Sequence, residues 1–162
     1  MDAVWSELSG HVDLIVASPL SRCAEPAQAW AASAGIDCSL DERVMEMHYG
    51  AWEGKTSAEI RAEFPGMLDQ WRQNPEGMRP PGGESPEELR ARLTDWWEEA
   101  RHKHDGKRIL VVAHSGSLRM LIAIALAAPI LTSRRLDMPY ACWSRIAANE
   151  SHTWLMHHNL AR

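Results

Sequence analysis

The stretch Ile109-Leu-Val-Val-Ala-His-Ser-Gly-Ser-Leu-Arg119 decides the fold, because it changes its pattern within a few residues. Its first five residues are apolar and mostly β-branched, which predicts a buried strand. Residues 115–117 favour a turn and a helix cap ahead of the apolar series that begins at Leu118. In a parallel sheet, such a junction brings the strand end to the N–H groups of a helix N-terminus, where anions bind. His114 stands at this point, either as a phosphate-site residue or only as a hydrogen-bonded turn histidine.

The length and composition indicate a single domain. The chain has 162 residues, enough for one three-layer core, and we expect one domain over residues 1–162. Its 17 basic and 22 acidic residues give a net charge of −5, and no run of Lys or Arg forms a basic stripe. We therefore expect no nucleic acid partner, although small anions could still bind locally.

The cysteines and apolar segments bear on the cellular compartment of the protein. Cys23, Cys38 and Cys142 are odd in number and contain no C-x-x-C pair, which argues against disulfides or a zinc site. The first residues lack the basic segment and apolar core of a signal peptide, and the apolar series 118–131 is too short to span a bilayer. We therefore expect a cytoplasmic protein without membrane contact.

Apolar periodicity, helix caps and turn residues predict the remaining elements. Strands are expected at residues 11–17, 38–40, 140–147 and 153–157. The last two strands form a C-terminal hairpin. Helices are expected at residues 2–9, 21–34, 56–65, 68–74 and 85–105, and a buried helix at residues 118–131.

A second strand-to-helix junction carries Arg22. The preceding strand ends at Ser18-Pro19, because proline cannot continue a strand ladder. Because parallel strands end at one sheet edge, we expect Arg22 and His114 to lie side by side in a phosphate-sized pocket. Glu46, from the following loop, would protonate a departing oxygen, a step worth typically ~100- to 10,000-fold in rate. The three side chains suggest phosphoryl transfer, whereas the alternatives are a helix-capping arginine and an exposed loop acid.

Four motifs in sequence order resemble the histidine phosphatase superfamily, the phosphoglycerate-mutase-like group. They are Ala17-Ser-Pro-Leu-Ser-Arg-Cys-Ala-Glu-Pro-Ala27, Glu46-Met-His-Tyr-Gly-Ala-Trp-Glu-Gly54, Pro81-Gly-Gly-Glu-Ser85 and Val111-Val-Ala-His-Ser-Gly116. The resemblance covers nearly the whole chain. The cysteine after Arg22 and the glycine pair before Glu84 resemble the α-ribazole phosphatase branch, which dephosphorylates a cobalamin precursor.

The resemblance implies a role for each candidate residue. Arg22 matches the family's second phosphate-binding arginine, His114 its second histidine and Glu46 its proton donor. Arg22 would donate charge-assisted hydrogen bonds to phosphate oxygens, and His114 would stabilise the charge of the transferring group. We also expect Ser115, at the start of the helix, to contribute to phosphate binding. The family mechanism requires no metal and no cofactor.

One family element is absent from the chain. The family begins with a strand that ends in Arg-His-Gly and supplies the nucleophilic histidine, and this sequence contains no Arg-His-Gly. The chain enters the family pattern midway through the first helix, near Ala3, Val4 and Leu8. We therefore expect an N-terminally incomplete domain without a nucleophile, and no turnover by this chain alone.

The resemblance implies a three-layer α/β/α fold with a mixed, mostly parallel sheet that lacks the first strand. That strand would lie between the strand at Ile109 and the C-terminal hairpin, so its absence leaves two sheet edges unpaired. Three outcomes are possible. The hairpin closes directly on the strand at Ile109, a partner chain donates or swaps a strand in a homodimer, or the native protein is longer.

Two functional hypotheses follow. The first is a phosphomonoesterase, with α-ribazole 5′-phosphate as the substrate that the branch resemblance implies. The alternative is a pseudophosphatase that retained Arg22 and His114 but lost the nucleophile, and that acts as a phosphate-ligand binding or oligomeric interaction module. In both cases the expected ligand is a small phosphorylated metabolite or inorganic phosphate.

Overall fold

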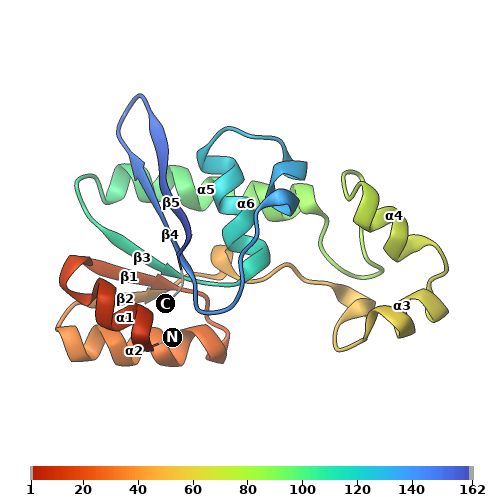
Figure 1. Ribbon diagram of the computed structural model, residues 1–162, viewed down its shortest axis with the longest axis horizontal. Helices are drawn as coiled ribbons and strands as arrows, with labels where there is room; N and C mark the ends of the chain where they lie inside the picture. Colours follow the sequence, from red (N-terminus) through yellow and green to blue (C-terminus); the bar gives the residue numbers. More distant parts are fainter. Residues whose placement is uncertain (1, 161–162) are drawn as a thin grey trace.

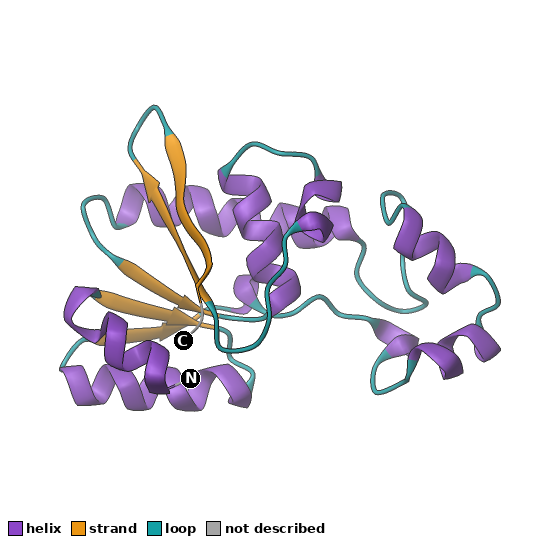
Figure 2. Cartoon of the chain, in the orientation of Figure 1, coloured by secondary structure: helices purple, strands orange, loops and turns teal. Residues whose placement is uncertain are grey.

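A three-stranded parallel sheet lies at the centre of the molecule (Figures 1 and 2). The computed structural model describes residues 2–160. The strands, in the order β2-β1-β3, are β2 (Asp37–Leu40), β1 (Leu14–Ala17) and β3 (Ile109–Val112). The sequence Leu-Ile-Val-Ala of β1 suits the central position, because a central parallel strand is covered on both faces. The two predicted strands that end at the strand-to-helix junctions are therefore confirmed.

Helices cover both faces of this sheet (Figure 1). One face carries α1 (Asp2–Leu8) and α2 (Ser21–Ala34), and the other carries α5 (Pro86–Lys103) and α6 (Ser115–Ala125). The mixed α/β architecture with helices on both sides is thus confirmed. Short 3₁₀ helices lie at Ser9–His11, Glu42–Val44, Gly50–Trp52 and Ile130–Arg135.

Alternate side chains of β1 belong to two different hydrophobic clusters, as the pleat of a strand requires. Ile15 is fully buried in a cluster that includes Trp30 of α2. Val16 belongs to the cluster on the opposite face, which includes Leu93 and Trp96 of α5. The core therefore fixes β1 from both sides and, through it, the loop that follows the strand.

Two short helices lie away from the sheet, at the far right of Figure 1. They are α3 (Ser57–Glu63) and α4 (Met67–Gln73). A capping box at Thr56 starts α3, as the sequence predicts. Trp52 packs edge-on against Trp71, with ring centroids 5.6 Å apart, and joins this helical pair to the preceding loop.

The C-terminal hairpin forms a separate sheet. Its strands are β4 (Trp143–Ala148) and β5 (Thr153–Leu160), which pair antiparallel with each other. Within residues 2–160, neither strand pairs with β3. Direct closure of the hairpin on the strand at Ile109, one of the three expected outcomes, is therefore not observed.

Several predicted element bounds are wrong. The strand expected from residue 11 begins at Leu14, after the 3₁₀ helix Ser9–His11, and the last strand continues past residue 157 to Leu160. The helix expected to run to Leu131 ends at Ala125, because Ala127 adopts a left-handed conformation with φ of 50°. The first hairpin strand begins at Trp143, later than predicted, because Ala141 has a φ of 55° and interrupts the extended backbone. Among the helices of residues 2–160, none combines the length and the apolar character that a membrane span requires.

Candidate active site

The ends of β1 and β3 bring the two predicted junctions together. Ala17 and Val112 lie opposite each other in the parallel register, and the N–H of Ser18 donates to the carbonyl of Val112 at 3.0 Å. The chain leaves both strands at the same edge and enters α2 and α6. As a result Arg22, in the first turn of α2, contacts His114, the residue that precedes α6.

Hydrogen bonds define the protonation state of His114. Arg22 Nε donates to His114 Nδ1 at 3.2 Å, and a guanidinium nitrogen can only donate. Nδ1 is therefore unprotonated, so Nε2 carries the proton and donates it to Ser18 Oγ at 2.8 Å. The ring is held in one neutral tautomer between a cation and a hydroxyl group. Ser18, fully buried, is a partner that the sequence analysis did not identify.

The surroundings of His114 favour its neutral form. Burial lowers the pKa of the imidazole below its ordinary value of 6.5, and the positive charge of Arg22 lowers it further. Glu46 acts in the opposite direction and raises this pKa, as the third contribution in size. The net shift is downward, so His114 is uncharged near neutral pH and presents one N–H donor.

Cys23 lies against the same ring. Its Sγ is 3.7 Å from His114 Nε2 and 3.5 Å from the carbonyl oxygen of Ala113, to which the thiol donates. The thiol is buried, and this burial raises its pKa. Cys23 is therefore a protonated thiol that packs beside the imidazole.

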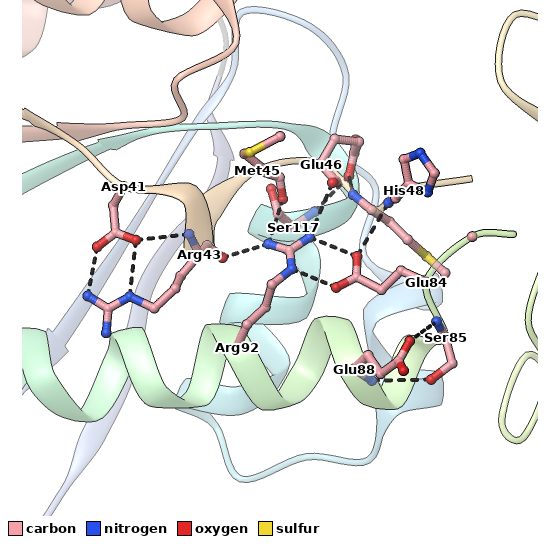
Figure 3. Close-up of polar contacts among 12 residues, drawn as sticks. Asp41, Arg43, Met45, Glu46, His48, Glu84, Ser85, Glu88, Arg92 and Ser117 are labelled. Carbon is pink, nitrogen blue, oxygen red and sulfur yellow. Dashed lines mark hydrogen bonds and ion pairs between the residues drawn. The ribbon is translucent and has the colours of Figure 1, made fainter. Parts of the chain in front are cut away.

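Glu46 reaches the start of α6 from a distant loop (Figure 3). Its carboxylate accepts hydrogen bonds from the N–H of Gly116 at 3.3 Å and of Ser117 at 3.2 Å. A Cβ at Gly116 would lie 2.4 Å from Glu46 Oε1, so any larger residue here would displace the carboxylate from this position. The sequence analysis expected these helix amides to face a bound anion, whereas they bind the protein's own carboxylate.

The candidate residues share one end of a large cavity. Its volume is about 1140 Å³, and Arg22, Cys23, Glu46, His114 and Ser115 line it together with residues of β3 and β4. Arg22 forms no ion pair within residues 2–160, and Nε is its one hydrogen-bonding nitrogen there. Its remaining guanidinium donors are available to a planar or tetrahedral oxyanion. Cation, imidazole N–H and carboxylate thus meet at one place.

Comparison with known families decides the classification. The family model described as the histidine phosphatase superfamily, branch 1, matches residues 1–161. The chain belongs to the histidine phosphatase superfamily. The resemblance drawn from the four motifs is confirmed, whereas the roles of the individual site residues remain predictions.

Curated relatives of this superfamily member include longer proteins. A glucosyl-3-phosphoglycerate phosphatase of Mycolicibacterium vanbaalenii is 33% identical over 148 residues, which cover 84% of this chain and 64% of that protein. A bifunctional protein of Mycobacterium tuberculosis is 32% identical over 135 residues, which cover 83% of this chain. The chain spans 37% of the length of the first curated relatives that it matches.

Solved structures of the superfamily share the fold. The native mycobacterial glucosyl-3-phosphoglycerate phosphatase superposes with a TM-score of 0.86 at 28% identity, covering 99% of this chain and 84% of that one. An α-ribazole phosphatase from Shigella flexneri gives a TM-score of 0.84 at 21% identity, covering 98% of this chain and 81% of that one. At that identity the second likeness shows the fold alone.

We predict that His114 makes stability depend on pH. The unfolded imidazole takes up a proton near pH 6.5, while the folded one resists protonation because its pKa is lowered. Acid therefore favours the unfolded state, and the free energy of unfolding should fall as the pH drops from 6.5 towards the folded pKa. Denaturant unfolding between about pH 7 and pH 5 should show a smaller decrease for His114→Gln than for the wild type. Identical pH dependences would contradict the lowered pKa.

Proposed function

We propose that this chain supplies the phosphate-binding and proton-transfer groups of a phosphomonoesterase. The observation that carries the proposal is the contact of Arg22 with His114 at the cavity end that Glu46 also lines. Such a set can hold a phosphoryl group, neutralise its charge and protonate a leaving oxygen. Family membership supports the same reaction class.

Each group has a separate task in the proposed reaction. The free guanidinium donors of Arg22 bind two phosphate oxygens. The Nε2–H of His114 turns from Ser18 Oγ to a third oxygen as charge builds up on the phosphoryl group. Glu46, in its protonated form, would give a proton to the departing alcohol oxygen when the P–O bond breaks. By family resemblance, a histidine nitrogen forms the new bond to phosphorus, and water then releases inorganic phosphate.

The nucleophilic histidine would come from a strand in the cavity between β3 and β4. The edge of β3 that faces away from β1 has no strand partner within residues 2–160, and residues of both β3 and β4 line the cavity. A strand that paired parallel with β3 would lie about 4.8 Å from it. Its carboxyl end would then lie beside Arg22 and His114. A preceding segment of a longer polypeptide, or a strand swapped between the subunits of a homodimer, would supply it.

The substrate class follows from two likenesses. The branch motifs favour α-ribazole 5′-phosphate, an intermediate of cobalamin synthesis, which would place the enzyme in the cytoplasm. The relative at 33% identity is named for glucosyl-3-phosphoglycerate instead. Release of inorganic phosphate from both compounds, measured side by side on a chain that carries the nucleophile, distinguishes the two substrates.

A specific observation favours a second function, that of a pseudophosphatase. The 162 residues contain no Arg-His-Gly, while Ser18 binds His114 and the amides of Gly116 and Ser117 bind Glu46. A chain with these internal partners could act as a phosphate-ligand binding or oligomeric interaction module. The DNA upstream of Met1 separates the alternatives. An in-frame strand ending in Arg-His-Gly supports the enzyme, and a stop codon supports the pseudophosphatase.

We predict that inorganic phosphate binds at Arg22. Replacing Arg22 by Met should weaken binding about tenfold or more, because a charge-assisted hydrogen bond is lost. Arg61→Met is the matched control, since Arg61 lies on α3 and pairs with Asp69 of α4. Isothermal titration with phosphate measures both. Wild-type protein without affinity for phosphate, or equal affinities of the two variants, would contradict the pocket.

We also predict negligible hydrolysis of a generic aryl phosphate by the 162-residue chain, because it lacks the family's nucleophile. Phosphate release by the wild type should not exceed that by His114→Ala. Turnover that disappears in His114→Ala would instead reveal a surrogate nucleophile within this chain. That result would replace the proposed source of the nucleophile while keeping the reaction class.

A further inference from the structure

Arg92 of α5 is the most extensively hydrogen-bonded side chain near the site (Figure 3). A guanidinium group has five N–H donors, and each donor of Arg92 has one acceptor. Nε donates to Glu84 Oε1 at 2.7 Å, and one terminal nitrogen donates to Glu84 Oε2 at 2.9 Å. The other three bonds go to backbone carbonyls of the loop that carries Glu46.

These three carbonyls lie immediately before Glu46 or belong to it. Arg92 donates to the carbonyl of Arg43 at 2.6 Å, to that of Met45 at 2.9 Å and to that of Glu46 at 3.2 Å. Such a set of acceptors fixes the course of the backbone over residues 43–46. A lysine could not reproduce it, because an ammonium group has three donors at a single nitrogen.

Glu84, which Arg92 binds, holds the loop on the other side of Glu46. We call Arg92 and Glu84 together the clamp. The N–H of Glu84 donates to the carbonyl of His48 at 2.7 Å, and its Oε2 accepts from the N–H of His48 at 3.3 Å. A Cβ at the neighbouring Gly83 would lie 2.6 Å from the His48 carbonyl oxygen, so the two loops meet backbone to backbone. The sequence analysis offered no role for Arg92, and Glu84 serves the loop and not an open pocket.

The clamp holds the backbone of Glu46, and the Glu46 side chain in turn contacts the start of α6. Its carboxylate reaches the N–H groups of Gly116 and Ser117 only while the backbone of residues 43–48 keeps its present position relative to α6. Arg43, on the same loop, offers no such support. Its side chain binds those of Asp41 and Glu99, and it donates to none of the three carbonyls that Arg92 binds.

We propose that Arg92 is a positioning residue of the site: together with Glu84 it holds the backbone around Glu46, so that the Glu46 carboxylate stays at the N-terminus of α6. The inference rests on the proposed function, in which Glu46 gives the proton to the leaving oxygen. Arg92 itself does not line the cavity that His114 and Arg22 share. Its effect reaches the chemistry through the loop.

The first amides of α6 report the position of Glu46. The N–H groups of Gly116 and Ser117 lie in the first helical turn, where no preceding carbonyl of the helix can accept from them. Their protection against hydrogen exchange therefore depends on the Glu46 carboxylate. The N–H of Leu118 donates to the His114 carbonyl at 2.8 Å and serves as an internal reference for an intact helix.

The experiment is amide hydrogen exchange by NMR on the 162-residue chain. Arg92→Met and Arg92→Lys should each lower the protection of the Gly116 and Ser117 amides about tenfold, the value expected for loss of a hydrogen bond to a charged acceptor. Glu46→Ala should give the same loss. Leu118 should keep wild-type protection in every variant.

The matched control is Arg43→Met, which removes two ion pairs from the same loop but none of the carbonyl bonds. It should leave Gly116 and Ser117 protected. Wild-type protection of these amides in Arg92→Lys would overturn the proposal. So would loss of Leu118 protection in Arg92→Lys, because Arg92 would then be a determinant of folding and not of the position of Glu46.

Titration of the same variants with inorganic phosphate separates this proposal from the proposed function. Exchange at Gly116 and Ser117 requires neither a bound anion nor turnover. Absence of phosphate binding in the wild type would contradict the proposed function and leave the exchange result intact. Retained phosphate binding with unchanged exchange in Arg92→Lys would contradict only the positioning role.

Discussion

The parallel pairing of β1 with β3 is the constraint on which the site depends. Ala17 and Val112 lie opposite each other, so the chain leaves both strands at one level and enters α2 and α6 from the same edge. Arg22 and His114, which are 92 residues apart, can therefore form a hydrogen bond. Any slip in this register would separate the cation from the imidazole and remove the proposed oxyanion site.

The helix amides and the Arg22–His114 pair at this sheet edge have different partners. The amides that begin α6 are occupied by the Glu46 carboxylate, so in the proposed function an external oxyanion would depend on the guanidinium of Arg22 and the N–H of His114. The neutral state of His114 suits this division, because burial and the neighbouring guanidinium lower its pKa. Glu46 also lines the cavity, and in the proposed function it gives a proton to the leaving group.

The sequence was sufficient for features that depend on local patterns. The apolar runs ending at Ser18 and His114 predict two neighbouring strand-to-helix junctions, and the capping residues at Thr56 and Ser85 predict helix starts that the structure confirms. The helix that ends at Ala125 was predicted too long, because apolar residues continue beyond the left-handed turn that stops it.

Contacts between residues far apart in the sequence could not be predicted from local patterns. Ser18 looks like a turn residue in the sequence, and only the register of β1 and β3 shows that its hydroxyl binds His114. Arg92 looks like one of several charges on an amphipathic helix, since no spacing rule connects it to carbonyls more than 40 residues earlier. Glu46 was predicted as the acid of the site, a role that the family resemblance supported, but its contact with Gly116 required the fold.

A crystal structure of the chain with orthovanadate tests the central claim most directly, because vanadate mimics a phosphoryl group in transfer. The account predicts one vanadate in the cavity, with oxygens within hydrogen-bond distance of the Arg22 guanidinium and of His114 Nε2, and with Ser18 Oγ released from the ring. Vanadate bound elsewhere, or a His114 ring that still donates to Ser18 beside a vanadate held by other residues, would contradict it.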